Sequence, residues 1–218
     1  FGTLSESSNT AGGHIAGALP HRKAAGEARD NAGMHAADIV AGSPDVTLLF
    51  GLEPDDLTCS EDAKGKLAEH KFVAALTPYA SESLLESANL LLPTGTFAET
   101  SGTFVNCEGR WQSFAGIANP VGEARPGWKI LRVIGNLLDA DGIEYTSTEE
   151  VLAELQDQVG EPEPDNAYQG SASIAKPNGA DEPGNEVDVP IYEIDAVVRR
   201  ATALQLTPDA LRARDGAS

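Results

Sequence analysis

The sequence predicts an α/β fold: a partial Rossmann-like parallel sheet with helices, followed by a hairpin and helix extension, a linker and a short helical tail. Three observations carry this prediction. Short apolar runs alternate with helical stretches between residues 45 and 93, as in βαβ units with parallel strands. A Gly/Thr-rich loop with two short strand-like runs follows. A long stretch with apolar residues at helical spacing comes next.

The opening of the chain is rich in Ala and Gly. It predicts a short helix or loop at 5–20 and a better-defined helix at 34–42. The second helix is expected to end at Gly42, because Pro44 follows.

The predicted sheet unit consists of alternating strands and helices. In chain order these are a strand at 45–50, a helix at 60–70, a strand at 71–77, a helix at 81–88 and a strand at 89–93. Ser81 is suited to cap the second helix. Continuous apolar runs such as Leu90–Leu92 predict strands that are covered on both faces.

A hairpin is predicted around Glu108 and Gly109, between the runs TFVNC and RWQSF. Glycines recur every seven residues here, at Gly95, Gly102, Gly109 and Gly116, and glycine is suited to joints with positive φ. Two interpretations stay open. The hairpin is a structural element, or it lines an inherited cofactor groove or a subunit interface.

Two further helices are predicted after the hairpin. The first spans 125–142, with Pro126 in its first turn and Gly142 in place to stop it. The second spans 147–159 and opens with a capping box formed by Ser147 and Glu150.

The chain is expected to divide into three parts. Residues 1–159 form the α/β domain, 160–186 an acidic, Pro/Gly-rich and disordered linker, and 187–218 a tail with short helices. Asp195 and Thr207 are suited to cap the tail helices.

Composition excludes some functions. The formal net charge is −19, from 34 acidic and 15 basic residues, and such a field repels nucleic acid. No apolar run approaches the roughly 18 to 20 residues of a membrane span, so no direct membrane insertion is expected. The chain begins without Met or a signal sequence, which suggests a piece of a longer protein. The two cysteines, Cys59 and Cys107, lack the spacing of a metal motif and are expected to be unpaired thiols.

No catalytic residue and no metal site is predicted. The four histidines lack metal-ligand spacing, and no nucleophile stands in a known context. The one weak candidate for cofactor binding is the loop after the first strand, with Gly51, Glu53 and Asp55. It lies where a nucleotide-binding loop would lie, although its carboxylates would repel a pyrophosphate. It is either a remnant of a nucleotide-edge loop or a plain turn.

The region 90–138 resembles the late part of the molybdopterin oxidoreductase domain. Within that family it is most similar to the G subunits of NADH-quinone oxidoreductase (respiratory complex I). An apolar strand ending in Pro93 precedes the motif, and a Gly-Glu-x-Arg-Pro-x-Trp run (122–128) opens the next helix. The motif residues are Glu99, Thr100, Gly102, Thr103, Phe104, Asn106, Glu108, Gly109 and Arg110.

The resemblance implies a structural C-terminal segment of the G-type polypeptide, itself non-catalytic, which supports electron transfer from NADH to quinone coupled to proton translocation. It implies no cofactor here, [4Fe–4S] and [2Fe–2S] clusters in an N-terminal part, other peripheral-arm subunits as partners, and the cytoplasmic face of the bacterial inner membrane. The motif residues are then structural.

Two alternatives remain. The chain is a C-terminal fragment of a molybdopterin-dependent enzyme similar to formate dehydrogenase, or it is a free-standing acidic α/β binding module.

Overall fold

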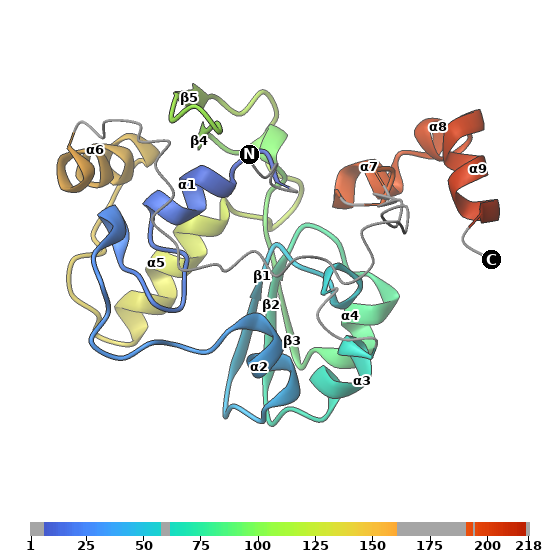
Figure 1. Cartoon of the computed structure of the whole chain (residues 1–218), viewed down its shortest axis with the longest axis horizontal. Helices are drawn as coiled ribbons and strands as arrows, with labels where there is room; N and C mark the ends of the chain where they lie inside the picture. The colour runs from blue at the N-terminus through green and yellow to red at the C-terminus, as the bar shows by residue number, and fades with distance from the viewer. Residues whose placement is uncertain (1–6, 58–61, 161–190, 194, 217–218) are drawn as a thin grey trace, which may run out of the picture. The chain divides into compact units, whose positions relative to one another are not determined.

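The computed structural model describes residues 7–57, 62–160, 191–193 and 195–216. Its contacts divide the chain into two compact units, Phe1–Pro164 and Asp165–Ser218, and each is described by itself. Cys59 and almost all of the predicted linker, from residue 161 on, lie outside the described residues. The first unit has the α/β architecture that the sequence predicts, as Figure 1 shows.

A three-stranded parallel sheet forms the centre of the first unit. Its strands β1 (Thr47–Phe50), β2 (Val73–Thr77) and β3 (Leu90–Pro93) lie in the order β1-β2-β3. Helices α3 (Ala63–Ala68) and α4 (Glu82–Ser87) connect them. The predicted cap of α4 is confirmed, because the Ser81 hydroxyl accepts a hydrogen bond from the Leu84 N–H.

The core lies between one face of this sheet and helices α3 and α4. Leu49, Ala75 and Leu91 stand side by side in the strand register and point to this face. Leu67 of α3 and Leu84 of α4 pack there and are fully buried. Burying a leucine side chain contributes about 1.5–3 kcal/mol, so these contacts are the main source of the sheet's stability.

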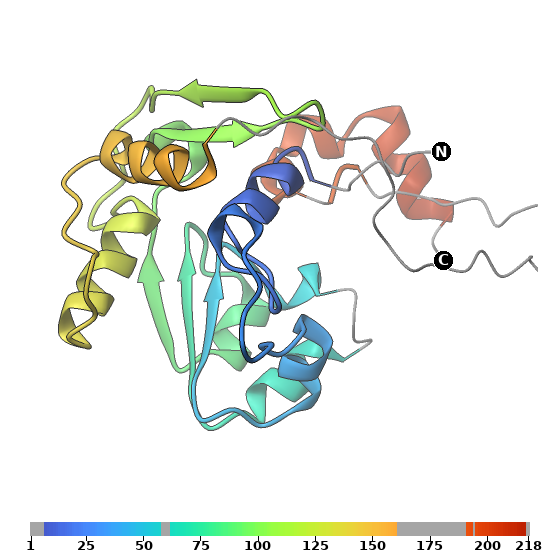
Figure 2. The ribbon, with the colours of Figure 1, turned by 60° about the vertical axis from the view of Figure 1, so that its left-hand side comes forward.

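The opposite face of the sheet is covered unevenly. Every residue of β2 is buried, but in β1 Leu48 and Phe50 are 44% and 49% exposed. Helix α5 (Gly127–Leu137) lies on this side, away from α3 and α4 (Figures 1 and 2). The prediction of strands covered on both faces is therefore right for β2 and wrong for β1 and β3. Their exposed residues Leu48, Phe50 and Leu90 stand on the face away from α3 and α4, which the described residues cover only in part.

Helix α5 approaches the sheet closely at its first residue. A Cβ on Gly127 would lie 2.6 Å from the Cε2 atom of Phe50. Pro126 is the N-cap residue rather than a member of the first turn. The helix also ends earlier than predicted, at Leu137, because Asp139 has a φ of 53° and the Ala140 N–H bonds to the Gly135 carbonyl. This is a Schellman motif, so Gly142 plays no part in stopping the helix.

Two helices precede the sheet, α1 (Thr10–Ile15) and α2 (Ala36–Ala41), and the second ends at Gly42 as predicted.

A buried histidine joins α2 to the sheet. The His70 Nδ1 lies 2.8 Å from the Thr47 hydroxyl, and its Nε2 lies 3.4 Å from the Val40 carbonyl. A carbonyl only accepts, so Nε2 carries the proton and Nδ1 accepts from Thr47.

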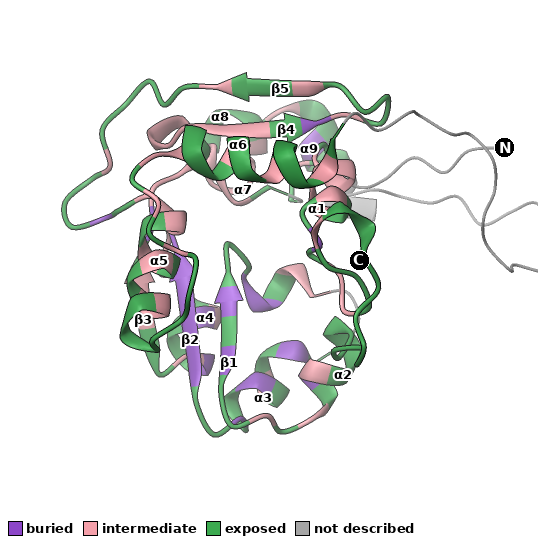
Figure 3. Ribbon diagram, turned by 90° about the vertical axis from the view of Figure 1, so that its left-hand side faces the viewer, coloured by how far each residue is buried: buried purple, intermediate pink, exposed green. Residues whose placement is uncertain are grey.

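A hairpin and a further helix complete the first unit. Strands β4 (Gly102–Val105) and β5 (Trp111–Phe114) pair antiparallel, as predicted, and lie beyond the carboxyl ends of β1 and β2 in Figure 3. Helix α6 (Thr148–Val159) follows. The Ser147 hydroxyl accepts from the Glu150 N–H as predicted, but the Glu150 carboxylate takes hydrogen bonds from the N–H and hydroxyl of Thr146. The return bond to the Glu150 carboxylate thus comes from Thr146, one residue before the N-cap Ser147.

The described residues of the second unit form three short helices, α7 (Ala196–Arg200), α8 (Thr202–Gln205) and α9 (Pro208–Gly216). The Asp195 carboxylate accepts from the N–H groups of Val197 and Val198, and the Thr207 hydroxyl accepts from the Ala210 N–H. Both predicted caps are therefore present. Helix α8 is an additional element between them.

Candidate functional site

The loop after β1 carries the weak cofactor-binding candidates. Gly51 adopts a φ of 65°, which permits the sharp turn out of the strand. Glu53 is 3% exposed, and it forms a reciprocal capping box with Asp56 around the short 3₁₀ helix Pro54–Asp56. The Asp55 carboxylate accepts a hydrogen bond from the Ser83 hydroxyl at 2.6 Å. The structure brings these residues together in one turn.

The donor set of this loop does not suit an anionic cofactor. A pyrophosphate at a loop of this kind is held by free backbone N–H groups and cations. Here the Glu53 N–H is already bonded to the Asp56 carboxylate at 2.8 Å. Glu53, Asp55 and Asp56 place three carboxylates within four residues. The residues present therefore do not fit the pyrophosphate of a pterin dinucleotide.

The motif begins with a short capped turn after β3. In the 3₁₀ helix Phe97–Glu99, the Glu99 carboxylate accepts from the N–H and the hydroxyl of Thr96, at 2.7 and 3.0 Å. The Thr96 N–H bond is the main cause that holds the pKa of the Glu99 carboxyl below its ordinary value. Glu99 thus bonds chiefly within its own turn, with a smaller contribution from the Val121 backbone, and no ion pair of the described residues joins it to Arg110. Thr100, next to it, donates to the Ser101 carbonyl at 3.3 Å.

The second half of the motif shapes the turn of the hairpin. The Asn106 side-chain oxygen accepts from the N–H groups of Glu108 and Arg110, at 3.0 and 2.9 Å. Gly109 has a φ of 77°, and its N–H bonds to the Asn106 carbonyl at 2.9 Å. Asn is suited to such a turn because its short side chain reaches its own backbone. The turn therefore explains Asn106 and Gly109, whereas Glu108 and Arg110 contribute backbone N–H groups to it.

The strands of the hairpin are tied by side chains on opposite faces. A Cβ on Gly102 would lie 2.9 Å from the Cζ atom of Phe114, which stacks edge-on against Phe104 at 5.2 Å between ring centroids. The Thr103 hydroxyl lies 3.0 Å from that of Ser113 across the strands. Glycine at 102 therefore leaves room for the Phe114 ring, which a larger residue would displace.

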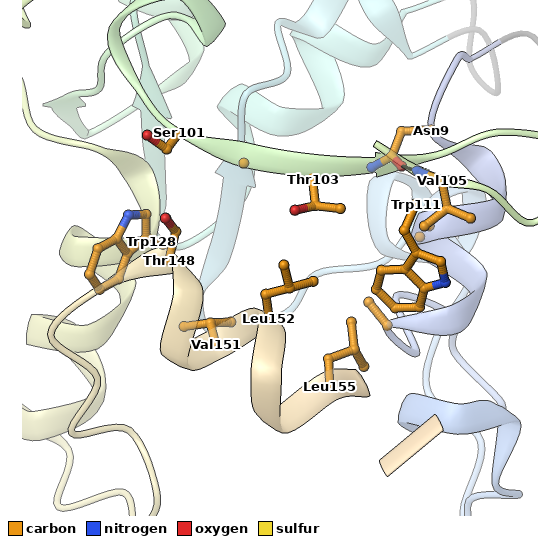
Figure 4. Close-up of a pocket in the computed structure, with 14 residues that line it drawn as sticks. Asn9, Ser101, Thr103, Val105, Trp111, Trp128, Thr148, Val151, Leu152 and Leu155 are labelled. Atoms are coloured by element: carbon orange, nitrogen blue, oxygen red, sulfur yellow. Dashed lines mark hydrogen bonds between the residues drawn. The ribbon is translucent and has the colours of Figure 1, made fainter. Parts of the chain in front are cut away.

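A cavity of about 310 Å³ lies between the hairpin, α1 and α6 (Figure 4). Gly102 and Thr103 of the motif line it, together with Trp111 and Trp128. Residues that the sequence did not single out complete the wall, namely Gly12 and Gly13 of α1 and Val151, Leu152 and Leu155 of α6. The available signal was the apolar spacing in α6, which by itself predicts only a buried helix face.

Metal-ligating and nucleophilic side chains do not gather elsewhere in the described part of the chain. Its residues contain no group of three or more His, Cys, Asp or Glu side chains that could hold a metal ion. Cys107 is exposed and free at the hairpin turn. No helix among the described residues combines the length and apolar character needed to cross a bilayer.

Comparison with known proteins points to one family. The family model described as molybdopterin oxidoreductase matches residues 9–137, more than half of the chain. This range includes the sheet, the hairpin and α5.

Individual relatives carry several functions. The chain is 45% identical over 53 residues to the mitochondrial NADH-ubiquinone oxidoreductase 78 kDa subunit of Candida albicans, covering 24% of this chain and 7% of that protein. It is 30% identical to a nitrate reductase of Synechocystis, over 56% of this chain and 17% of the relative. It is 29% identical to the G subunit of NADH-quinone oxidoreductase from Shewanella oneidensis, over 44% of this chain and 12% of the relative. The matched part therefore spans less than a fifth of each of these relatives.

Proposed function

The chain belongs to the molybdopterin oxidoreductase family, and from this premise we propose that it is a structural C-terminal segment of a G-type subunit of NADH-quinone oxidoreductase. In this role the segment holds no redox centre. It supports electron transfer from NADH to quinone, coupled to proton translocation, which takes place at [4Fe–4S] and [2Fe–2S] clusters elsewhere in the longer polypeptide. Two relatives bear names of this enzyme.

One observation carries this proposal. The loop at the end of β1 offers carboxylates and an occupied N–H where a pterin dinucleotide would need anion-binding groups. The motif residues Glu99, Asn106 and Gly109 support it, because each is engaged in the turn or hairpin that contains it. A family member without a cofactor at this place is suited to a packing role.

The proposed partners are other subunits of the peripheral arm of complex I, at the cytoplasmic face of a bacterial inner membrane. The strongly acidic composition disfavours nucleic acid as a partner. The exposed face of β1, with Leu48 and Phe50, offers apolar area for packing within such an assembly.

A second candidate is favoured by the relatives. The nitrate reductase of Synechocystis matches 56% of this chain, and putative formate dehydrogenases of Staphylococcus aureus match 31% at up to 37% identity. In this alternative the chain is a fragment of a molybdopterin-dependent enzyme, and the Gly51–Asp55 loop contacts the cofactor.

Elemental and pterin analysis of the purified full-length polypeptide that contains this segment separates the two candidates. The structural proposal expects iron without molybdenum, tungsten or pterin. Stoichiometric molybdenum or tungsten with a pterin would overturn it and favour the alternative.

A matched pair of variants tests the structural role within the assembly. Asn106→Ala removes the acceptor for two turn N–H groups. It is expected to lower recovery of the assembled complex and its NADH-driven quinone reduction in parallel, with the iron content per assembled complex unchanged. Gln112→Ala, at an exposed position of β5, is the control and is expected to assemble normally. Full assembly of Asn106→Ala would contradict the role proposed for the hairpin.

A further inference from the structure

The cavity between α1, the hairpin and α6 has the size of a small-molecule site. Its volume of about 310 Å³ lies at the lower end of the range for ligand pockets, roughly 300–1,000 Å³. Trp128 and Trp111 stand at opposite ends of it in Figure 4, while Leu152 and Thr103 point into the space between them from opposite sides. Three separate elements of the first unit thus converge on one space.

The wall of this cavity is uncharged. Among the described residues that line it none carries a charge, although the chain contains 49 acidic and basic residues (34 and 15). Val151, Leu152 and Leu155 present an apolar side. A charged ligand would lose hydration here and would find no ion-pair partner among the lining residues, so the lining disfavours one. A charge near the site is the Lys129 ammonium, which lies 5.4 Å from the centroid of the Trp128 ring.

Two polar groups of the wall are already engaged. The Asn9 side-chain oxygen accepts from the Val105 N–H at 2.9 Å, and the Thr103 hydroxyl pairs with that of Ser113 at 3.0 Å. Because apolar and aromatic side chains make up much of the wall, we expect apolar and ring contacts to hold the occupant. Indole rings offer large flat surfaces for such contacts.

Gly13 of α1 forms the part of the wall that we call the floor of the cavity, and the space beside it is empty. A Cβ added at Gly13 would meet no atom within 4 Å, and this residue lies inside helix α1, where any side chain is permitted. Its neighbour Gly12 differs, because a Cβ there would lie 2.2 Å from the Asn9 side-chain oxygen. Packing thus requires glycine at 12 but not at 13, where the missing side chain leaves the space free.

We propose that this cavity binds a small, neutral molecule that carries an aromatic ring, held between Trp111 and Trp128. A smaller apolar cavity, of about 150 Å³, takes up neutral aromatic molecules such as benzene. The inference rests on the geometry of the cavity alone and is independent of the function proposed above.

Fluorescence provides a direct test with the full chain. The chain contains two tryptophans, and both line the cavity, so energy transfer from tryptophan to a probe reports binding to the chain, and the variants described next locate it. The probe is N-phenyl-1-naphthylamine, which is neutral and aromatic. Saturable binding with energy transfer is expected. Absence of saturable binding would overturn the proposal.

Variants and a charged analogue locate the site and its selectivity. Gly13→Leu fills the open floor and is expected to weaken probe binding by about tenfold or more without lowering Tm. His14→Leu is the control, because it places the same side chain at the next, exposed position of α1, and it should bind like the unmodified chain. The anionic analogue 8-anilinonaphthalene-1-sulfonate should bind about tenfold more weakly.

Three further results would contradict the proposal. Equal binding by Gly13→Leu and the unmodified chain would place the probe elsewhere. Tighter binding of the sulfonate would contradict an uncharged site. Loss of probe binding when the chain is part of a purified larger assembly would show that a protein segment fills the cavity instead of a small molecule.

Discussion

The side-chain oxygen of Asn9 accepts a hydrogen bond from the backbone N–H of Val105 at 2.9 Å, and so joins α1 to β4 across 96 positions of the chain. Val105 is 2% exposed, which leaves water little access to this N–H. The bond positions α1 against the hairpin and thereby sets one wall of the cavity. Gly12 has no side chain and so leaves room for the Asn9 side chain that makes this bond.

Replacing Asn9 tests this link. Asn9→Ala is expected to destabilise the chain by about 1–3 kcal/mol, because it leaves a buried N–H without its acceptor. Urea unfolding at neutral pH measures the change. Asn9→Asp keeps an acceptor and should lower the free energy of unfolding by less. Ser8→Ala, at the exposed neighbouring position, is the control. An unchanged free energy of unfolding in Asn9→Ala would show that water or another group replaces the bond.

The approach of Phe114 to Gly102 gives a second prediction. Gly102→Ala should destabilise the chain by about 1–3 kcal/mol, because the new methyl group overlaps the ring. Phe114→Leu alone should also cost stability, since it removes the edge-on contact with Phe104. Because the smaller side chain makes room for the methyl group, the double variant is expected to be more stable than the sum of the two single losses. Strict additivity in thermal unfolding would refute this contact as the reason for glycine.

The buried pair of His70 and Thr47 gives a third prediction. Thr47→Val keeps the shape of the side chain but removes the hydroxyl that lies 2.8 Å from the His70 Nδ1. The expected loss is about 1–3 kcal/mol, because a buried ring nitrogen then lacks its donor. In His70→Phe, the same Thr47→Val change should cost less, and a double-mutant cycle measures the difference. A coupling of zero would count against the bond.

Three capping carboxylates make stability depend on pH. Hydrogen bonds from backbone N–H groups are the leading cause that lowers the pKa of Glu99, of Glu149 and of Glu150. A carboxyl whose pKa is lower in the folded state stabilises the fold above its unfolded pKa, about 4.3, and loses this contribution as the pH falls through the folded pKa. Acid should therefore destabilise the first unit.

Glu99→Gln isolates one of these groups. The variant cannot ionise, so its deficit in unfolding free energy relative to the unmodified chain should be largest at neutral pH and should shrink as the pH falls below about 4. Urea unfolding at a series of pH values measures it. Glu108→Gln, at an exposed position of the hairpin turn, is the control. A deficit that stays constant between about pH 7 and pH 3 would contradict the assignment.

Local signals in the sequence predicted much of the fold. Ser81, Asp195 and Thr207 cap helices as expected, because a capping bond joins residues two or three apart. Gly109 sits at positive φ in the predicted turn. The prediction failed at the end of α5, where a residue closer to the helix than the predicted one stops it. Asp139 adopts a positive φ, and the N–H groups of Asp139 and Ala140 bond to carbonyls of the last turn of α5. The helix therefore ends before Gly142.

The sequence by itself determined the order of strands and helices, the hairpin and the family, because these depend on periodicity, caps and a contiguous motif. Only the tertiary structure decided which face of each strand is buried, and that α1, the hairpin and α6 line a cavity without charged lining residues. Such features join residues far apart in the chain, as Asn9 and Val105 show. Their free energy comes from packing and burial, which no local pattern records.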